Sequence, residues 1–420
     1  MMKQKKRLLL VLAALALAAL TACGAGKPES PSVPDGTPEP SAPVETRLPT
    51  ETPGVPAASE AYAQEEALKT YWSEDQLTQT WGPNQVVEHM FFHPVVAYPE
   101  LAFDGDGMEK GIDDWMVTAD EYKKILQSLY DNDYILVDTR DVWSESDGAM
   151  VRSTLMLPEG KKPIILDFDD VNYYEYMLEN GFTYKLILGE DGNVWSYGKD
   201  PQGNDVISQD LDAITILDKF VREHPDFSLN GVKGGINLTG YQGILGYRTQ
   251  TDRDVTDPTE LAVFEENRQK EIEAVKPIIA RLKETGWYFT SHTWGHINLA
   301  NKSLATVQND TQRWLDEVGS LVGETPILVY PHGARPDGDD VKQTGPIFQY
   351  LYDQGFRYFF SVGINSFSKL KTDLPVVIGD RLHPDGTTLR SERCRDWYKQ
   401  FYDTREIIDL TVRPDYGWYK

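Results

Sequence analysis

The chain has few cysteines, a deficit of positive charge and no long apolar run after its first twenty residues. Its 420 residues include only two cysteines, Cys23 and Cys394, so a disulfide-rich fold is excluded. The 41 lysines and arginines face 66 aspartates and glutamates, and the net charge of −25 argues against binding to nucleic acid or to anionic lipid. No later apolar run reaches the length of about 20 residues that spans a bilayer. A Gly-rich phosphate loop is also missing near the motifs described below, which disfavours phosphoester hydrolysis.

The first 22 residues have the pattern of a signal peptide. A basic start is followed by the apolar stretch 8–20 and then by Leu20-Thr21-Ala22-Cys23, which resembles a bacterial lipoprotein lipobox. This resemblance implies cleavage before Cys23, lipidation of that cysteine and an extracytoplasmic, membrane-anchored protein, which would leave Cys394 without a disulfide partner. The alternative is an ordinary secretory signal in which the cysteine is accidental. Residues 23–60 are rich in Pro, Ser, Thr and Glu, and we expect a disordered tether there.

A short helical lead-in is expected over residues 61–84, with a helix at Ala61–Tyr71, and one folded domain over residues 85–420. Within this domain, strand and helix patterns alternate from Ile164 onward. Such alternation predicts a parallel α/β sheet covered by helices, either open or closed into a barrel. Polar clusters follow the predicted strands that end at Leu166, Thr290, Val329 and Gly379. In a barrel these positions lie at the carboxyl ends of the strands, where active sites form.

Two of these clusters contain candidate metal ligands. His292 and His296 stand four residues apart, and one helical turn would place both imidazoles on the same face. Asp169 and Asp170 end an apolar strand, where a buried carboxylate needs a partner. Each pair alone has a plain alternative, unrelated histidines in the first case and a turn-initiating aspartate pair in the second.

Taken together, the two pairs predict a catalytic metal site. Asp170, His292 and His296 would supply one oxygen and two nitrogens and leave a position open for water. Such a donor set suits zinc, with cobalt or nickel as alternatives. Asp169, next to the site, could then take a proton from the water.

The motifs FDD at Phe168–Asp170, HTWGH at His292–His296 and YPHG at Tyr330–Gly333 occur in the order of a known family. They resemble the polysaccharide deacetylase domain, also called the NodB-homology domain or carbohydrate esterase family 4. FFHP at Phe91–Pro94 resembles the strand that opens many secreted lipoprotein members. The resemblance covers roughly residues 85–390.

The resemblance implies a distorted (β/α) barrel that removes acetyl groups from sugars with the help of a metal. It assigns Asp169 as the base and Asp170, His292 and His296 as the ligands. Thr293 matches the Ser or Thr that braces the histidine loop in the family. His332 stands where the family has a Tyr, whose backbone N–H helps to hold the oxyanion, a role that a change of side chain can preserve. Leu382-His383 resembles the late Leu-x-His motif without its spacer residue, and His383 is the candidate general acid.

The sequence also departs from the family pattern. Val171 stands in place of a Gly, Asp167 in place of a Thr, and Val329 in place of the Arg that steadies the base. Either Arg335 or Arg381 could replace that Arg. The segment between the Asp-Asp and His-x-x-x-His motifs is long and contains a predicted hairpin at 182–195. Aromatic residues that could stack on sugars, or simply pack, are Tyr173, Tyr174, Tyr176, Trp195, Tyr241 and Trp294.

These observations predict a monomeric, lipid-anchored deacetylase of cell-envelope or extracellular polysaccharide, with an N-acetylglucosamine-containing glycan as substrate. The departures around Asp169 leave one rival open. In that reading the barrel has lost its activity and serves as a glycan-binding envelope lipoprotein.

Overall fold

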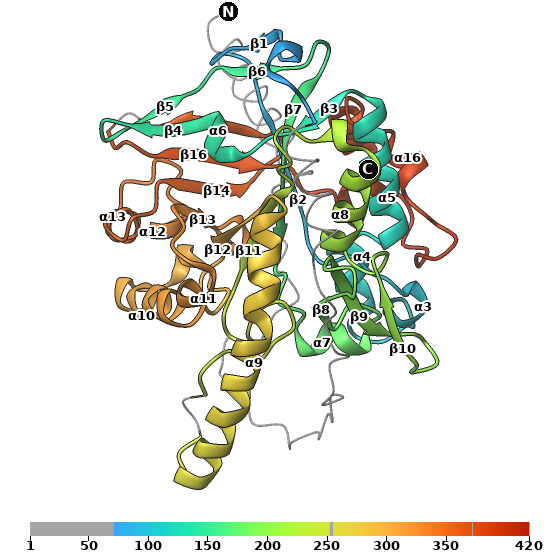
Figure 1. The fold of residues 1–420 in the computed structure, drawn as a ribbon, viewed down its shortest axis with the longest axis vertical. Helices are drawn as coiled ribbons and strands as arrows, with labels where there is room; N and C mark the ends of the chain where they lie inside the picture. Colours follow the sequence, from blue (N-terminus) through green and yellow to red (C-terminus); the bar gives the residue numbers. More distant parts are fainter. Residues whose placement is uncertain (1–70, 253–254, 372, 420) are drawn as a thin grey trace, which may run out of the picture.

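The computed structural model describes residues 71–252, 255–371 and 373–419 (Figure 1). The predicted signal peptide, Cys23, the tether and nearly all of the predicted helix at Ala61–Tyr71 lie outside these residues. Strand β1 (Gln79–Trp81) precedes the domain start that we expected at Gln85, and it pairs antiparallel with β6 (Leu155–Leu157). Among the helices of the described residues, none combines the length and the apolar character that a bilayer crossing requires.

A nine-stranded sheet organises the fold. Seven of its strands form a parallel series, in the spatial order β16 (Val377–Arg381), β14 (Tyr358–Val362), β13 (Ile327–Val329), β12 (Trp287–Ser291), β11 (Gly234–Leu238), β7 (Lys162–Asp169) and β2 (Glu88–Phe92). β15 (Phe367–Leu370) adds antiparallel to β16, and β3 (Tyr134–Leu136) pairs with the start of β7. A parallel bridge between Met90 and Leu382 joins the two ends of the series. The predicted α/β barrel is confirmed in a nearly closed form.

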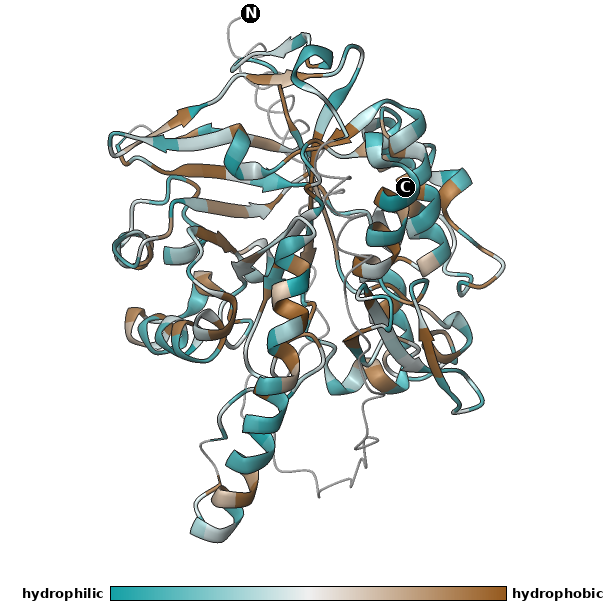
Figure 2. Cartoon of the chain, viewed as in Figure 1, coloured by the Kyte–Doolittle hydropathy of each residue, from teal (hydrophilic) through white to brown (hydrophobic). Residues whose placement is uncertain are grey.

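Helices cover the outside of this sheet, and several have capping residues that the sequence makes visible. In α5 (Ala119–Asp131) the Thr118 hydroxyl accepts from the Glu121 N–H, while the Glu121 carboxylate accepts from the Thr118 N–H. The other long helices are α8 (Ala213–Glu223), α9 (Pro258–Glu284), α10 (Leu304–Trp314) and α13 (Pro346–Asp353). Hydrophobic residues concentrate in the strands, whereas the projecting half of α9 is largely hydrophilic (Figure 2).

Short elements fill the connections. The short helices are α3 (Pro99–Ala102), α4 (Glu109–Trp115), α6 (Thr139–Val142), α7 (Glu175–Glu179), α11 (Ser320–Val322), α12 (Pro336–Asp339), α14 (Gly386–Arg390), α15 (Glu392–Tyr398) and α16 (Thr404–Ile407). β4 (Trp143–Ser146) and β5 (Ala149–Arg152) form a separate hairpin. The predicted hairpin at 182–195 is present as β8 (Lys185–Leu188) and β9 (Val194–Lys199), to which β10 (Asp205–Ser208) adds a third strand that the sequence analysis missed.

A buried ionic cluster fixes the end of the chain to the first helices of the domain. Arg413 pairs with Asp113 of α4 at 2.9 Å and with Glu121 of α5 at 2.7 Å, and Arg390 pairs with the same Asp113 at 2.9 Å. Since fully buried charges require partners, the cluster ties the C-terminal helices to the N-terminal side of the barrel. The segment that follows β16 is therefore held in place on the barrel.

Candidate active site

The carboxyl ends of the parallel strands bring the candidate residues together, as the strand-end argument predicted. Asp169 is the last residue of β7, and Asp170 follows it. His292 and His296 follow β12, His332 follows β13, and His383 lies two residues beyond β16. The side chains come from four strands that are far apart in sequence, and the barrel places them at one end.

Asp170, His292 and His296 form the one cluster in the described residues whose ligand atoms could hold a metal, since these atoms lie within 4.8 Å of one another. The Nε2 atom of His296 is 3.6 Å from the Asp170 carboxylate. The Nδ1–H of His292 donates to the carbonyl of Val329 at 3.0 Å, which leaves its Nε2 lone pair for a ligand. Burial lowers the pKa of His296 well below its usual value and so keeps this imidazole neutral. The donor set therefore fits a divalent cation.

The loop that carries the histidines differs from our expectation. The helical turn considered for 292–296 is wrong, because Thr293 and His296 adopt φ values of 59° and 50°. The two imidazole rings still lie close, with centroids 5.0 Å apart. The Thr293 hydroxyl accepts from the N–H of Ile297 at 3.1 Å, in agreement with the bracing role implied by the family resemblance.

A buried carboxylate on α10 fixes the same loop. Asp310 is 6 % exposed and accepts from the N–H groups of Trp294 and Gly295, each at 2.8 Å. Its pKa is raised to about 6 by burial, against the lowering effect of these two bonds. The sequence analysis missed this residue, because nothing local connects a helix interior to a loop fifteen residues earlier.

Replacing Asp310 by Ala should therefore weaken metal binding without removing a ligand. Loss of a supporting contact next to metal ligands costs about 10- to 100-fold in affinity, and competition with a chelating dye measures it. Asp316→Ala, which removes an exposed carboxylate from the following turn, is the matched control. Equal metal affinity in the two variants would contradict the role of Asp310.

The guanidinium of Arg381, a residue far from Asp169 in the sequence, keeps Asp169 in its ionised form. Arg381 of β16 donates to both of its oxygens, each at 2.8 Å, and the Asn237 amide adds a bond of 2.5 Å. Burial alone would raise the pKa of Asp169, but Arg381 and His292 lower it well below its usual range. Asp169 is therefore ionised at neutral pH and is available to accept a proton.

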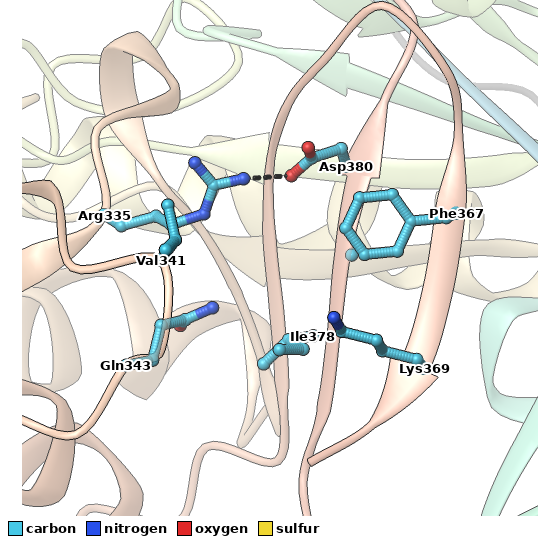
Figure 3. Close-up of a pocket in the computed structure, with 8 residues that line it drawn as sticks. Arg335, Val341, Gln343, Phe367, Lys369, Ile378 and Asp380 are labelled. Atoms are coloured by element: carbon cyan, nitrogen blue, oxygen red, sulfur yellow. Dashed lines mark hydrogen bonds and ion pairs between the residues drawn. The ribbon is translucent and has the colours of Figure 1, made fainter. Parts of the chain in front are cut away.

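This geometry decides between the two arginines that the sequence offered. Arg335 pairs instead with Asp380 in a surface pocket lined also by Phe367, on the outside of the sheet (Figure 3). Arg381 also lies 3.4 Å from Asp167, whose carboxylate accepts from His89 Nε2 at 2.8 Å. Asp167, which stands where the family has a Thr, thus supports the arginine that holds Asp169.

A chain of hydrogen bonds leads from His383 toward the triad through a histidine that the sequence analysis did not assign. His383 Nδ1–H donates to Asp385 at 3.0 Å, so its Nε2 accepts from His93 Nδ1–H at 3.0 Å. His93 Nε2 lies 3.9 Å from the Asp170 carboxylate. Burial, together with His383, lowers the pKa of His93 to about 3. The position of His93 at the end of β2, in the FFHP motif, was the signal that could have identified it.

Two more side chains complete the surroundings of the triad. The exposed His332 ring packs edge-on against His296 with centroids 4.5 Å apart, and His332 itself has a φ of 58°. The Tyr174 hydroxyl donates to the second oxygen of Asp170 at 2.6 Å. Left-handed backbone at Asp170, Thr293, His296 and His332 is the kind of local strain that concentrates at functional sites.

The fold and this cluster define a barrel enzyme with its site at the strand ends. The family model for polysaccharide deacetylase matches residues 262–345 of the chain. The matched segment includes His292, His296 and the YPHG motif, whereas Asp169 and Asp170 precede it. The family and the deacetylase class of enzyme, both predicted from the motifs, are confirmed.

Solved structures with a similar arrangement include Streptococcus pyogenes deacetylase PplD in complex with acetate, at 14 % identity and a TM-score of 0.39, covering 72 % of this chain and 93 % of that one. IcaB from Ammonifex degensii is 13 % identical with a TM-score of 0.36, covering 71 % and 91 %. BA0330 from Bacillus anthracis is 13 % identical with a TM-score of 0.40, covering 71 % and 65 %. These likenesses are distant and carry no argument about activity. No curated protein matches the chain.

Proposed function

We propose that the protein is a metal-dependent hydrolase that removes acetyl groups from cell-envelope or extracellular polysaccharide, with an N-acetylglucosamine-containing glycan as substrate. The single observation that carries this proposal is the pairing of an ionised Asp169 with the neighbouring triad of Asp170, His292 and His296. A base beside a two-nitrogen, one-oxygen metal site can activate water for the hydrolysis of an acetyl group.

Asp170, His292 and His296 would hold the metal, and their donor set suits zinc, with cobalt or nickel as alternatives. When bound, a divalent metal supplies Lewis acidity and lowers the pKa of a water molecule toward neutrality. Asp169 accepts the proton of the attacking water at its carboxylate, which Arg381 keeps oriented. The backbone N–H of His332 is our candidate donor to the oxyanion.

The leaving amine or alcohol needs a proton, and His383 supplies it through His93. Before the transfer His383 carries protons on both ring nitrogens, with Nδ1–H held by Asp385, and His93 carries its one proton on Nε2. His93 Nε2, on the side that faces the triad, gives its proton to the leaving group while the His383 Nε2 proton passes to His93 Nδ1. Both rings are then neutral, with the His93 Nδ1–H donating to His383 Nε2 as in the structure. In this proposal His93 is the group nearest the substrate and His383 stands one hydrogen bond behind it.

The tether and anchor belong to the proposal as well. The lipobox that ends at Cys23 supports an extracytoplasmic protein held at the bacterial cell membrane by lipid. The mass of the N-terminal peptide of the mature protein would test this anchor.

The decisive experiment measures acetate release from chitooligosaccharides by the purified domain. We expect activity that is abolished by a chelator and restored by adding zinc, cobalt or nickel. Asp170→Asn should reduce kcat/KM at least about 10³-fold and also weaken metal binding, because one of three ligands is lost. Stoichiometric metal binding without acetate release from several acetylated glycans would contradict the proposal and favour the glycan-binding alternative.

A further inference from the structure

Three stacked tyrosine rings, which we call the tyrosine wall, lie beside the triad. Tyr174 and Tyr176 come from the segment that follows Asp170, and Tyr241 comes from the loop after β11. Tyr174 stacks against Tyr241 at 4.8 Å between centroids and 18° between planes. Tyr176 stacks against the same Tyr174 at 6.0 Å and 25°. The middle ring is buried at 3 % exposure, whereas the two outer rings are only partly buried.

The wall is attached to both halves of the triad. The Tyr174 hydroxyl contacts Asp170 at 2.6 Å and the Thr239 hydroxyl at 2.7 Å. The N–H groups of Gly240 and Tyr241 donate to the carbonyl of Trp294, which lies between the two histidine ligands, at 2.8 and 3.1 Å. The orientation of the rings is therefore fixed relative to the reacting centre.

Other aromatic residues that the sequence offered as sugar platforms are already engaged. The Arg313 guanidinium lies 3.3 Å from the centre of the Trp294 ring, and the Trp294 indole N–H donates to Glu317 at 2.9 Å. Tyr173 is buried completely. The indole N–H of Trp195 donates to Asp191 at 2.9 Å within the β8–β9 hairpin, which packs against α9. Tyr176 and Tyr241 remain as partly exposed rings in contact with the Asp170 surroundings.

We propose that Tyr176 and Tyr241 form a binding subsite for the sugar units next to the unit that is deacetylated. This inference rests on the proposed function. It adds that the protein also binds the sugar units beside the one that reacts. A pyranose ring has an apolar face of C–H bonds that packs on the negative face of an aromatic ring.

The surrounding charges limit the class of ligand. Glu175 beside the wall is exposed, and the whole chain carries a net charge of −25. Arg248, the nearby cation, donates to the backbone carbonyls of Gln242 and Tyr173 at 2.7 and 3.0 Å and so faces the protein. The subsite therefore takes a neutral N-acetylated sugar or its cationic deacetylated form rather than a polyanionic glycan.

Kinetics on substrates of increasing length test the subsite. For Tyr241→Ala and Tyr176→Ala we expect KM to rise about tenfold for chitotetraose and longer oligomers, with kcat within about twofold, since stacking on one ring contributes about one tenfold step in affinity. Hydrolysis of 4-nitrophenyl acetate, which has no neighbouring sugar unit, should stay unchanged. Tyr241→Phe keeps the ring and should behave as wild type, as should Tyr352→Ala, which removes a partly buried tyrosine on α13.

Two results would overturn the subsite. One is an unchanged KM for long oligomers in both alanine variants, and the other is an equal loss on oligomers and on 4-nitrophenyl acetate, which would indicate general damage to the site. Calorimetric titration with chitohexaose separates this inference from the proposed function. If wild type releases no acetate but binds the hexamer, and Tyr241→Ala weakens that binding about tenfold, the proposed function fails and the subsite stands.

Discussion

The Asp169→Asn variant should lose about 10³-fold in kcat/KM while it still binds one equivalent of metal. Removal of a general base costs about 10²- to 10⁴-fold, and the asparagine amide cannot accept the proton of water. Asp169 is not one of the three ligand residues, so the metal affinity should change little. Steady-state kinetics beside metal analysis of the purified variant check both parts of the expectation.

Two comparisons make this expectation specific to the base. Asp170→Asn should lose metal binding and activity together, whereas Asp169→Asn should lose activity alone. An Asp169→Asn variant that keeps more than about a tenth of wild-type kcat/KM would assign the base to another group. A thermal melt of each variant controls for folding, because the amide at position 169 pairs less well with Arg381.

The second large effect is expected for Arg381→Met. Arg381 is fully buried and donates to both oxygens of Asp169, so its loss leaves an uncompensated carboxylate in the interior. Breaking a buried pair in this way costs about 3–5 kcal/mol of folding stability. Urea denaturation measures that change. Arg335→Met is the matched control, because Arg335 pairs with Asp380 at the surface pocket and should cost less.

The same substitution should change how stability depends on pH. In wild type the pKa of Asp169 is lowered in the folded state, so its contribution is complete above the unfolded pKa of about 3.9 and is lost as pH falls through the folded value. Without Arg381, burial dominates and raises the pKa of Asp169 above the unfolded value. Stability should then fall as pH rises through that raised pKa, and the acid limb of the pH–rate profile should move to higher pH. An acid limb at the wild-type position would contradict the role of Arg381.

The sequence was most informative where strong apolar strands end in polar residues. β7 and β12 were visible from their composition, and parallel strands must end at the same edge, so Asp170 and the two histidines could be predicted to meet. The family pattern then separated the role of Asp169 from that of Asp170. The helices α5 and α9 begin after Thr118 and Asp257, residue types that favour the N-cap position of a helix.

What the sequence did not determine depends on contacts between distant segments. The choice of Arg381 over Arg335 required the position of β16 beside β2, and the two residues of the Arg381–Asp169 pair are 212 positions apart. The role of His93 required the same closure, because its partner His383 is 290 positions away. The short strands β1, β10 and β15 were missed, since three or four residues give too little alternation to be distinguished from a loop.

The closure of the barrel between Met90 and Leu382 has a consequence for how the enzyme matures. The strand that supplies Arg381 is the last of the sheet in chain order, and pairings over such a long separation form slowly during folding. Until β16 pairs with β14 and β2, Asp169 lacks its contact with Arg381, and His93 lacks its hydrogen-bond partner His383. A chain that stops before β16 would lack both Arg381 and His383, and we expect it to be inactive.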